Sequence, residues 1–262
     1  MTHSLRITPR PSIAWAIGLL YGPAFIALLL VSGVDYDTIA DSTHNFVRAV
    51  VVTMAILTVA VIALTTWLGW WRPVLRDDRP APRWMISIPI VFAIAILAGI
   101  DYGRVADLQT SFLLWAAVGT LMVGFCEEMV YRGLAVVGFR EGYSEVRVWL
   151  FSSLLFMLLH AWNLIAGQSL PATLFQLGFT FVLGSILYAV RRTTGTLVIP
   201  ILLHAGWDWT SFTGASDAFK NAADLVDPRA PIFTNVGIAV MVILFLVGAK
   251  RLLHPEATTP PS

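Results

Sequence analysis

Five ionisable side chains lie inside long apolar stretches of the sequence. They are Glu127, Glu128, His160, His204 and Asp208. A charged group near the middle of a membrane costs at least about 2.5–3.5 kcal/mol on insertion scales. Such residues are retained mainly where they pair with each other, line a cavity or take part in chemistry. Carboxylates and imidazoles in this setting can activate a water molecule, stabilise an oxyanion or bind a metal ion.

Helical spacing groups these residues into pairs on common helix faces. Glu128 and Arg132 are four residues apart, in the orientation that favours an ion pair. His204 and Asp208 have the same spacing, so both should point into one space. Glu127 lies about 100° around the helix from Glu128. We therefore assign Glu128 to the pair with Arg132 and leave Glu127 free for chemistry.

The composition requires that membrane helices position these residues. Of 262 residues, 57% are hydrophobic and only 13% are charged, with a mean hydropathy of +0.76, whereas soluble domains carry about 25% charged residues. A helix needs about 20 apolar residues to cross the hydrocarbon core. We predict an all-α, polytopic bundle of about eight membrane helices. The predicted spans are 13–33, 46–68, 84–100, 111–131 or beyond, 147–165, 172–190, 196–212 and 232–250.

The loops are too short for a soluble domain, so we predict one integral membrane domain over 1–262, with a catalytic core at about 110–212. The first apolar run lacks a small-residue cleavage pattern and should be retained as a span.

A net charge of +1 gives no basic excess, so no nucleic-acid partner is expected. The single cysteine, Cys126, excludes an internal disulfide, and beside Glu127 it should be a small buried residue rather than a nucleophile.

The distribution of basic residues predicts the orientation of the chain. With a cytoplasmic N-terminus, thirteen of the 17 Lys and Arg residues fall on the cytoplasmic side. The other four are Arg48, Arg104, Lys220 and Arg229. Positive residues favour the cytoplasmic side, so we predict a multi-pass protein of the cell membrane with both termini cytoplasmic. The proline-containing stretch 72–83 is then a topology-setting loop.

The predicted helices bring the ionisable residues to one depth. The fourth helix should continue to about residue 139, because apolar sequence follows Arg132. At 1.5 Å per residue, the ionisable residues of the fourth, fifth and seventh helices lie roughly 14–20 Å from the cytoplasmic ends of those helices. Three helices with ionisable groups at a similar depth predict one shared site.

Three motifs resemble those of the CPBP family of intramembrane proteases, which includes CAAX prenyl proteases, bacteriocin-processing enzymes and abortive-infection proteins. Residues 127–133 read E-E-M-V-Y-R-G and resemble the family signature E-E-x-x-[FY]-R-G. Phe156–His160 is similar to F-x-x-x-H, and His204–Asp208 is similar to H-x-x-x-[ND]. The motifs occur in the family's order over about 110–212, whereas the first three spans carry no signature.

The resemblance implies an intramembrane endopeptidase whose cavity opens toward the cytoplasm. Glu127 and His160 would activate a water molecule, and His204 and Asp208 would stabilise the oxyanion. Supporting residues would be Glu128, Tyr131, Arg132 and Phe156. The substrate would be a peptide or a membrane-anchored protein, prenylated or not, reached within the lipid bilayer.

Asp208 departs from the prenyl-protease branch, in which an asparagine donates a hydrogen bond at this position. An ionised aspartate would repel an oxyanion, so Asp208 is protonated, or it orients His204, or the site binds a metal. In the last case Glu127, His160, His204 and Asp208 form a ligand set that suits zinc. The cofactor is therefore either none or a divalent metal, with metal-free chemistry slightly favoured.

A proton-coupled transporter is the alternative function, because intramembrane Glu, His and Asp also serve as proton relays. Against it, the chain has no detectable repeat, and its buried polar residues gather at one depth.

Overall fold

The computed structural model describes residues 5–79, 81–214 and 232–254. These residues are folded as helices joined by short loops, and the only β-type pairing among them is one isolated bridge between Arg76 and Thr196. The longest helices are α1 (Pro11–Ser32), α3 (Thr53–Leu68), α7 (Thr110–Glu127), α9 (Glu145–Ala161), α10 (Leu170–Thr194), α11 (Val198–Gly214) and α12 (Ile232–Leu253). Shorter helices are α2 (Thr43–Phe46), α4 (Trp71–Leu75), α5 (Ser87–Ala98), α6 (Tyr102–Asp107) and α8 (Ala135–Phe139).

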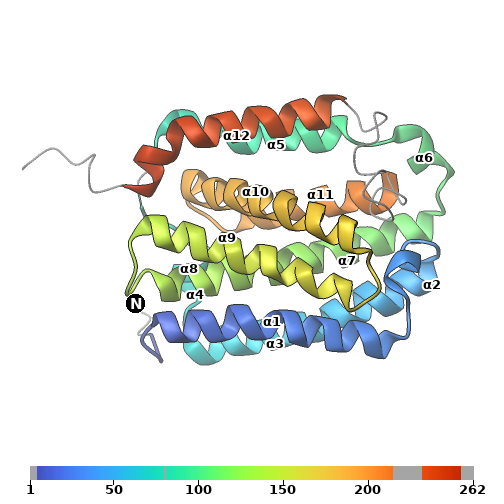
Figure 1. Cartoon of the computed structure of the whole chain (residues 1–262), viewed down its shortest axis with the longest axis horizontal. Coiled ribbons are helices and arrows are strands. Elements are labelled where there is room, and N and C mark those ends of the chain that lie inside the picture. Colours follow the sequence, from blue (N-terminus) through green and yellow to red (C-terminus); the bar gives the residue numbers. More distant parts are fainter. Residues whose placement is uncertain (1–4, 80, 215–231, 255–262) are drawn as a thin grey trace, which may run out of the picture.

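The long helices lie side by side along one axis of the molecule (Figure 1). α5 and α12 form one edge of the bundle and α1 and α3 the other, with α7, α9, α10 and α11 between them. The start of α1 and the end of α12 lie at the same end of the bundle, which we call the terminal end. The loop between α1 and α2 and the helix α6 lie at the opposite end. The helices that carry the predicted chemistry are therefore the central ones.

All eight predicted spans coincide with helical segments. Six of these are long and apolar enough to cross a membrane by length and composition, so the chain is a multi-pass membrane protein. The other two, predicted at 84–100 and 196–212, are helical over Arg83–Ala98 and Val198–Gly214, which are 17 residues or fewer. The count of eight spans and the orientation of the termini therefore remain predictions.

The fourth predicted span continues to Phe139, as expected from the apolar sequence after Arg132. It is not a regular α-helix throughout, because Glu128–Leu134 forms a π-helix (η4) between α7 and α8. A second π-helix, Val47–Val52 (η2), joins α2 to α3. Short π-helical turns within α-helices are frequent at functional sites. The sequence pattern indicated neither of them.

Gly124 sets the distance between α7 and α11. A β-carbon at this position would lie 2.7 Å from the backbone oxygen of Ile201 and 3.0 Å from the backbone nitrogen of Ala205. Both neighbours are backbone atoms of α11, so any larger residue would move the whole helix. Small residues allow this close approach of membrane helices. The close contact brings His204 of α11 next to the end of α7.

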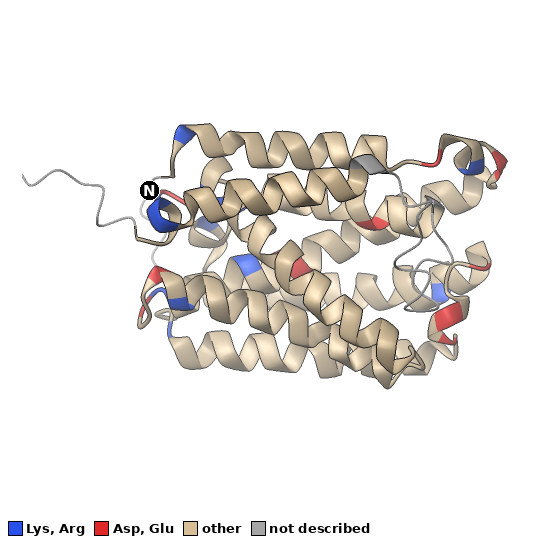
Figure 2. Ribbon diagram, turned by 45° about the horizontal axis from the view of Figure 1, so that its top comes forward, with Lys and Arg blue, Asp and Glu red and all other residues tan. Residues whose placement is uncertain are grey.

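Charged residues gather at the two ends of the bundle (Figure 2). At the end that holds the termini, five of them form a buried cluster, which we call the terminal ion cluster. Its members are Asp77, Arg140, Glu145, Arg191 and Arg192. Arg140 Nη2 lies 2.8 Å from Asp77 Oδ2 and 2.6 Å from Glu145 Oε1. The stretch 72–83 is therefore more than a topology-setting loop, because Asp77 within it is buried against three arginines.

The terminal ion cluster connects segments that are distant in the sequence. Arg191 Nε lies 3.3 Å from Asp77, and its Nη2 donates to the backbone oxygen of Pro73 at 2.8 Å. Arg192 Nη1 lies 2.8 Å from Glu145 and donates to the backbone oxygen of Leu252, also at 2.8 Å. The stretch after α4, the start of α9, the end of α10 and the end of α12 are thereby held together.

Candidate active site

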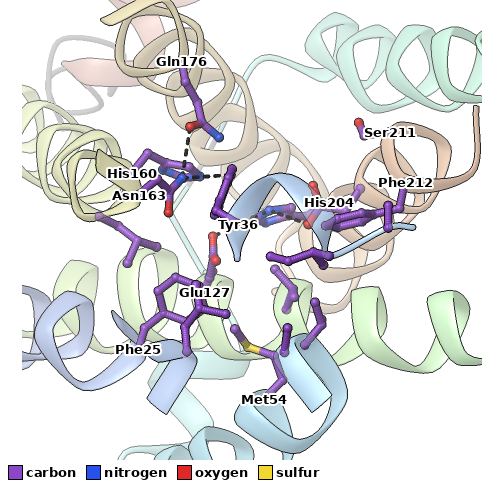
Figure 3. Close-up of a pocket in the computed structure, with 18 of the residues that line it drawn as sticks. Phe25, Tyr36, Met54, Glu127, His160, Asn163, Gln176, His204, Ser211 and Phe212 are labelled. Carbon is purple, nitrogen blue, oxygen red and sulfur yellow. Dashed lines mark hydrogen bonds and ion pairs between the residues drawn. The ribbon is translucent and has the colours of Figure 1, made fainter. Parts of the chain in front are cut away.

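A pocket of about 170 Å³ lies among the central helices, on the side of the loop after α1 (Figure 3). All four residues predicted to do chemistry line this pocket: Glu127, His160, His204 and Asp208. Its other walls are mainly apolar and are formed by Phe25, Leu29, Ile39, Ala40, Ala49, Val50, Met54, Val123, Leu159 and Phe212. The structure thus brings ionisable groups from α7, α9 and α11 to one cavity.

Glu127 is the last residue of α7, directly before the π-helix η4. Its side chain is 8% exposed, and its Oε2 has no hydrogen-bond partner among the described residues. His204 Nε2 lies 3.8 Å from this oxygen. Figure 3 shows the carboxylate pointing into the pocket. A buried carboxylate oxygen without a partner is costly, so Glu127 has the environment of a group that acts on a bound molecule.

Glu128 lies behind the pocket and is fully buried. Its Oε1 accepts a hydrogen bond from Arg132 Nη1 at 3.0 Å, so the ion pair expected from the spacing is present. The same oxygen lies 2.9 Å from His204 Nδ1. Because Glu128 is paired with an arginine and acts as an acceptor, Nδ1 of His204 is the nitrogen that donates. This contact fixes the imidazole and turns its Nε2 toward the pocket.

Phe156 packs against both histidines and the arginine. Its ring lies 3.9 Å from Arg132 Cζ, and its centroid is 5.1 Å from that of His160 and 5.6 Å from that of His204. Gly184 of α10 leaves room for these groups, because a β-carbon there would lie 2.8 Å from Arg132 Nη2. Tyr131 packs edge-on against the Phe156 ring, with 5.7 Å between the two ring centroids.

His160 is the penultimate residue of α9, and its Nδ1 lies 3.0 Å from the backbone oxygen of Phe156. This contact occupies one ring nitrogen of His160, so Nε2 is the nitrogen that can interact with a molecule in the pocket.

Asp208 is 21% exposed, and its Oδ2 lies 3.5 Å from His204 Nε2. The geometry is compatible with the alternative in which Asp208 orients His204.

Cys126 is buried beside Thr58, with 3.2 Å between the sulfur and the hydroxyl oxygen, as expected for a small buried residue.

The described residues contain no group of three or more His, Cys, Asp or Glu side chains arranged to hold a metal ion. His204 Nδ1 is already engaged by Glu128, and His160 Nδ1 by a backbone oxygen. As they lie, the four residues predicted as a ligand set do not form one. The metal alternative remains a prediction, and we assign no step to a metal.

Sequence reasoning missed the other polar residues of the pocket, namely Tyr36, Asp37, Asn163, Gln176 and Ser211. Tyr36 is in the loop after α1, outside every apolar stretch, so neither spacing nor hydropathy pointed to it. Asn163 follows His160 by three residues, a spacing that places both on one helix face. That spacing was the one signal in the sequence that could have identified it.

The mouth of the pocket lies at the end of the bundle opposite the termini. Asp37 lines the pocket and is exposed, so the pocket reaches the surface at the loop after α1. The resemblance implied a cavity that opens toward the cytoplasm, and the basic residues predicted cytoplasmic termini. These two expectations cannot both hold, because mouth and termini lie at opposite ends (Figure 1). We keep the charge-based orientation and predict that the pocket opens away from the cytoplasm.

Single-cysteine labelling tests this orientation, because Cys126 is the only native cysteine and is buried. In a Cys126→Ala background, we expect the Asp37→Cys variant to react with a membrane-impermeant maleimide only from the non-cytoplasmic side. The Asp78→Cys variant, at an exposed position near the other end, should react only from the cytoplasmic side. The measurement is labelling in sealed vesicles of each orientation. The reverse pattern would show that the termini are not cytoplasmic.

The fold and the site together define a multi-pass membrane protein with a buried carboxylate–histidine pocket. Residues 109–210 match the family model of Type II CAAX prenyl endopeptidase Rce1-like proteins. The matched region contains all three motifs, and it supports the resemblance to the CPBP/CAAX protease family. No curated protein and no solved structure matched the chain. The match supports a CAAX-type intramembrane endopeptidase in general and gives no support to a transporter.

Proposed function

We propose that this protein is an intramembrane endopeptidase in which Glu127 and His160 activate a water molecule to hydrolyse a peptide bond. One observation carries the proposal. Glu127 Oε2 is a buried carboxylate oxygen without a hydrogen-bond partner, directed into a largely apolar pocket that two histidines also line. A base near a bound water and a polar group near the carbonyl are what peptide hydrolysis needs.

In the proposed reaction, the oxygen of water forms a bond to the scissile carbonyl carbon as Glu127 accepts one proton of that water. The carbonyl π electrons move to the oxygen, giving a tetrahedral oxyanion. The oxyanion then collapses, the carbon–nitrogen bond breaks, and the leaving nitrogen takes up the proton. The products are a carboxylate and an amine, and no oxidant or reductant is required. His160 shares the proton with Glu127.

In this proposal, His204 and Asp208 serve to stabilise the oxyanion. His204 Nδ1 is held by Glu128, so its Nε2 is the atom that would donate to the oxyanion when it carries a proton. Asp208 would position that nitrogen from the other side, at 3.5 Å. In this arrangement Asp208 acts through His204 and does not contact the oxyanion.

The substrate is proposed to be a membrane-associated peptide or protein. The pocket walls are mainly apolar, so a hydrophobic residue or a lipid-modified residue next to the scissile bond would bury its surface there. A prenylated C-terminal peptide, the substrate class in the name of the matching family, is the first candidate. Unmodified membrane-proximal peptides are the second.

Purified protein in detergent should cleave at least one member of a panel of fluorogenic peptides, prenylated and unmodified. The His160→Asn variant should lose about 10²–10⁴-fold of that rate, because general base catalysis contributes on this order. The matched control is His44→Asn, which changes an exposed histidine near the same end of the bundle and should retain full activity. If no peptide is cleaved, or if His160→Asn is as active as wild type, the proposal is wrong.

The same preparation separates metal-free from metal-dependent chemistry. We expect cleavage to continue after chelator treatment and removal of bound metal, because the described residues form no ligand set. Loss of cleavage on chelation, with recovery on adding zinc, would instead establish the metal-dependent alternative.

A further inference from the structure

A chain of three polar side chains lines the pocket and has no role in the reaction described above. Asn163 donates its two amide hydrogens, one to the hydroxyl of Tyr36 at 3.1 Å and one to Gln176 Oε1 at 3.0 Å. The three residues come from three separate elements: the 3₁₀ turns Tyr36–Thr38 and Trp162–Leu164, and α10 (Figure 3). Asn163 and Gln176 are buried, and burying polar groups costs free energy unless they are satisfied. A polar chain in an apolar pocket therefore calls for a function.

Neither of these two hydrogen bonds uses the hydrogen of the Tyr36 hydroxyl. The Tyr36 hydroxyl oxygen accepts from Asn163, so its own hydrogen is available to another acceptor. The backbone nitrogen of Tyr36 donates to the backbone oxygen of Ala166 at 3.4 Å, which ties the loop to the turn after α9. The side chain is thus held at its hydroxyl and at its backbone, and its free O–H is directed by these two contacts.

The electrostatic environment keeps this hydroxyl protonated. Burial raises the pKa of Tyr36 to about 12; a hydrogen bond with Gln176 opposes the rise, and the negative charges of Asp208, Asp37 and Glu127 add to it. At neutral pH the group is therefore a neutral donor. Glu127 and Asp208 line the same pocket as Tyr36.

A neutral donor is what the oxyanion side of the pocket lacks. The related prenyl proteases are expected to have an asparagine donor at the position that Asp208 occupies here, and a carboxylate cannot donate when ionised. His204 alone would then have to stabilise the oxyanion. Removing one donor from an oxyanion-binding site typically costs about 10²–10³-fold in kcat, so a replacement donor would have a large effect.

We propose that Tyr36 is a further catalytic residue, whose O–H donates a hydrogen bond to the scissile carbonyl oxygen and to the oxyanion formed from it. Asn163 and Gln176 are positioning residues, because they hold the Tyr36 hydroxyl and do not contact the substrate oxygen. Tyr36 keeps its proton throughout, so the proton balance of the hydrolysis is unchanged. The inference rests on the proposed endopeptidase function.

The Tyr36→Phe variant tests the proposal, because it removes only the hydroxyl. We expect kcat to fall by about 10²–10³-fold with little change in KM. The control is Tyr102→Phe, which removes an exposed hydroxyl at the same end of the bundle and should leave kcat unchanged. Rates are normalised to the folded fraction, so a partly unfolded preparation still gives a usable kcat. An unchanged kcat, or a raised KM with kcat unchanged, would overturn the proposal.

The positioning role of Asn163 is tested separately, by the kcat of an Asn163 variant. The Asn163→Asp variant keeps the shape of the side chain but offers only an acceptor, so the Tyr36 hydroxyl would donate to it and be lost to the substrate. We expect its kcat to fall about as far as that of Tyr36→Phe. The double variant should then be no slower than Tyr36→Phe alone, because both changes remove one interaction. Additive losses would indicate a merely structural role for Asn163.

The two proposals fail in different ways. A wild-type protein that cleaves no peptide overturns the endopeptidase function itself. A wild-type protein that is active, with His160→Asn inactive and Tyr36→Phe fully active, overturns only the role of Tyr36.

Discussion

The Glu127→Gln substitution should reduce kcat by about 10²–10⁴-fold while leaving the protein folded. The amide has the shape of the carboxylate but cannot accept a proton from water, so it removes the proposed base without opening a cavity. Glu127 Oε2 has no hydrogen-bond partner among the described residues, and hence the substitution breaks no hydrogen bond at this oxygen. KM should change little, because the interaction lost belongs to the transition state.

The measurement compares steady-state cleavage with the thermal unfolding midpoint in the same detergent. Asp37→Asn is the matched control, because it makes the same chemical change at the exposed mouth of the same pocket. It should retain wild-type kcat. If Glu127→Gln keeps more than about a tenth of the wild-type kcat, Glu127 is not the base. If Asp37→Asn is equally impaired, the loss reflects pocket charge in general.

The second large effect that we expect is a loss of folding stability when the terminal ion cluster is changed. The Asp77→Asn substitution should destabilise the protein by about 3–5 kcal/mol, because removing one partner of a buried ion pair leaves the other charge uncompensated. Arg191 is fully buried, and Asp77 is its carboxylate partner at 3.3 Å. By the usual scaling, the unfolding midpoint should fall on the order of 10 °C. Asp78→Asn is the control, since it removes the same charge from an exposed neighbour.

The pH dependence of stability gives an independent check. Burial raises the pKa of Asp77, but Arg140, Arg191 and Arg192 outweigh that effect and lower the pKa below its ordinary value. A lowered pKa in the folded state means that the stabilising contribution is complete above about pH 4 and is lost as the pH falls through the folded pKa. The wild-type protein should therefore lose more stability on acidification than Asp77→Asn does. Parallel pH profiles for the two would contradict the assignment.

The sequence could predict that ionisable residues of three helices meet at one site, because their depths depend only on hydropathy and helix rise. Counting from the ends of apolar spans placed Glu127, His160 and His204 at similar depths, and these residues do line one pocket. The Glu128–Arg132 pair followed from their spacing in the same way. In contrast, the link from Glu128 to His204 joins residues 76 positions apart, so it depends on how α7 packs against α11.

The parts that could not be predicted depend on tertiary contacts of polar residues outside the apolar spans. Tyr36 belongs to a loop without periodicity, and only the fold directs it into the pocket. Asp77 was treated as part of a topology-setting loop, because a single carboxylate among several arginines has no local pattern that indicates burial. The π-helix at Glu128–Leu134 has no spacing signature of its own, since its register depends on the helices that surround it.

The pocket reaches the surface at the loop after α1, where Asp37 is exposed. Glu128, Tyr131, Arg132 and Phe156 are buried and are not among its lining residues. In the proposed function, a substrate that enters at this mouth meets a buried wall of protein behind Glu127, which favours scission near a free chain end over scission within a long folded chain. Release of the fragment buried deepest is then the step at which product inhibition is expected.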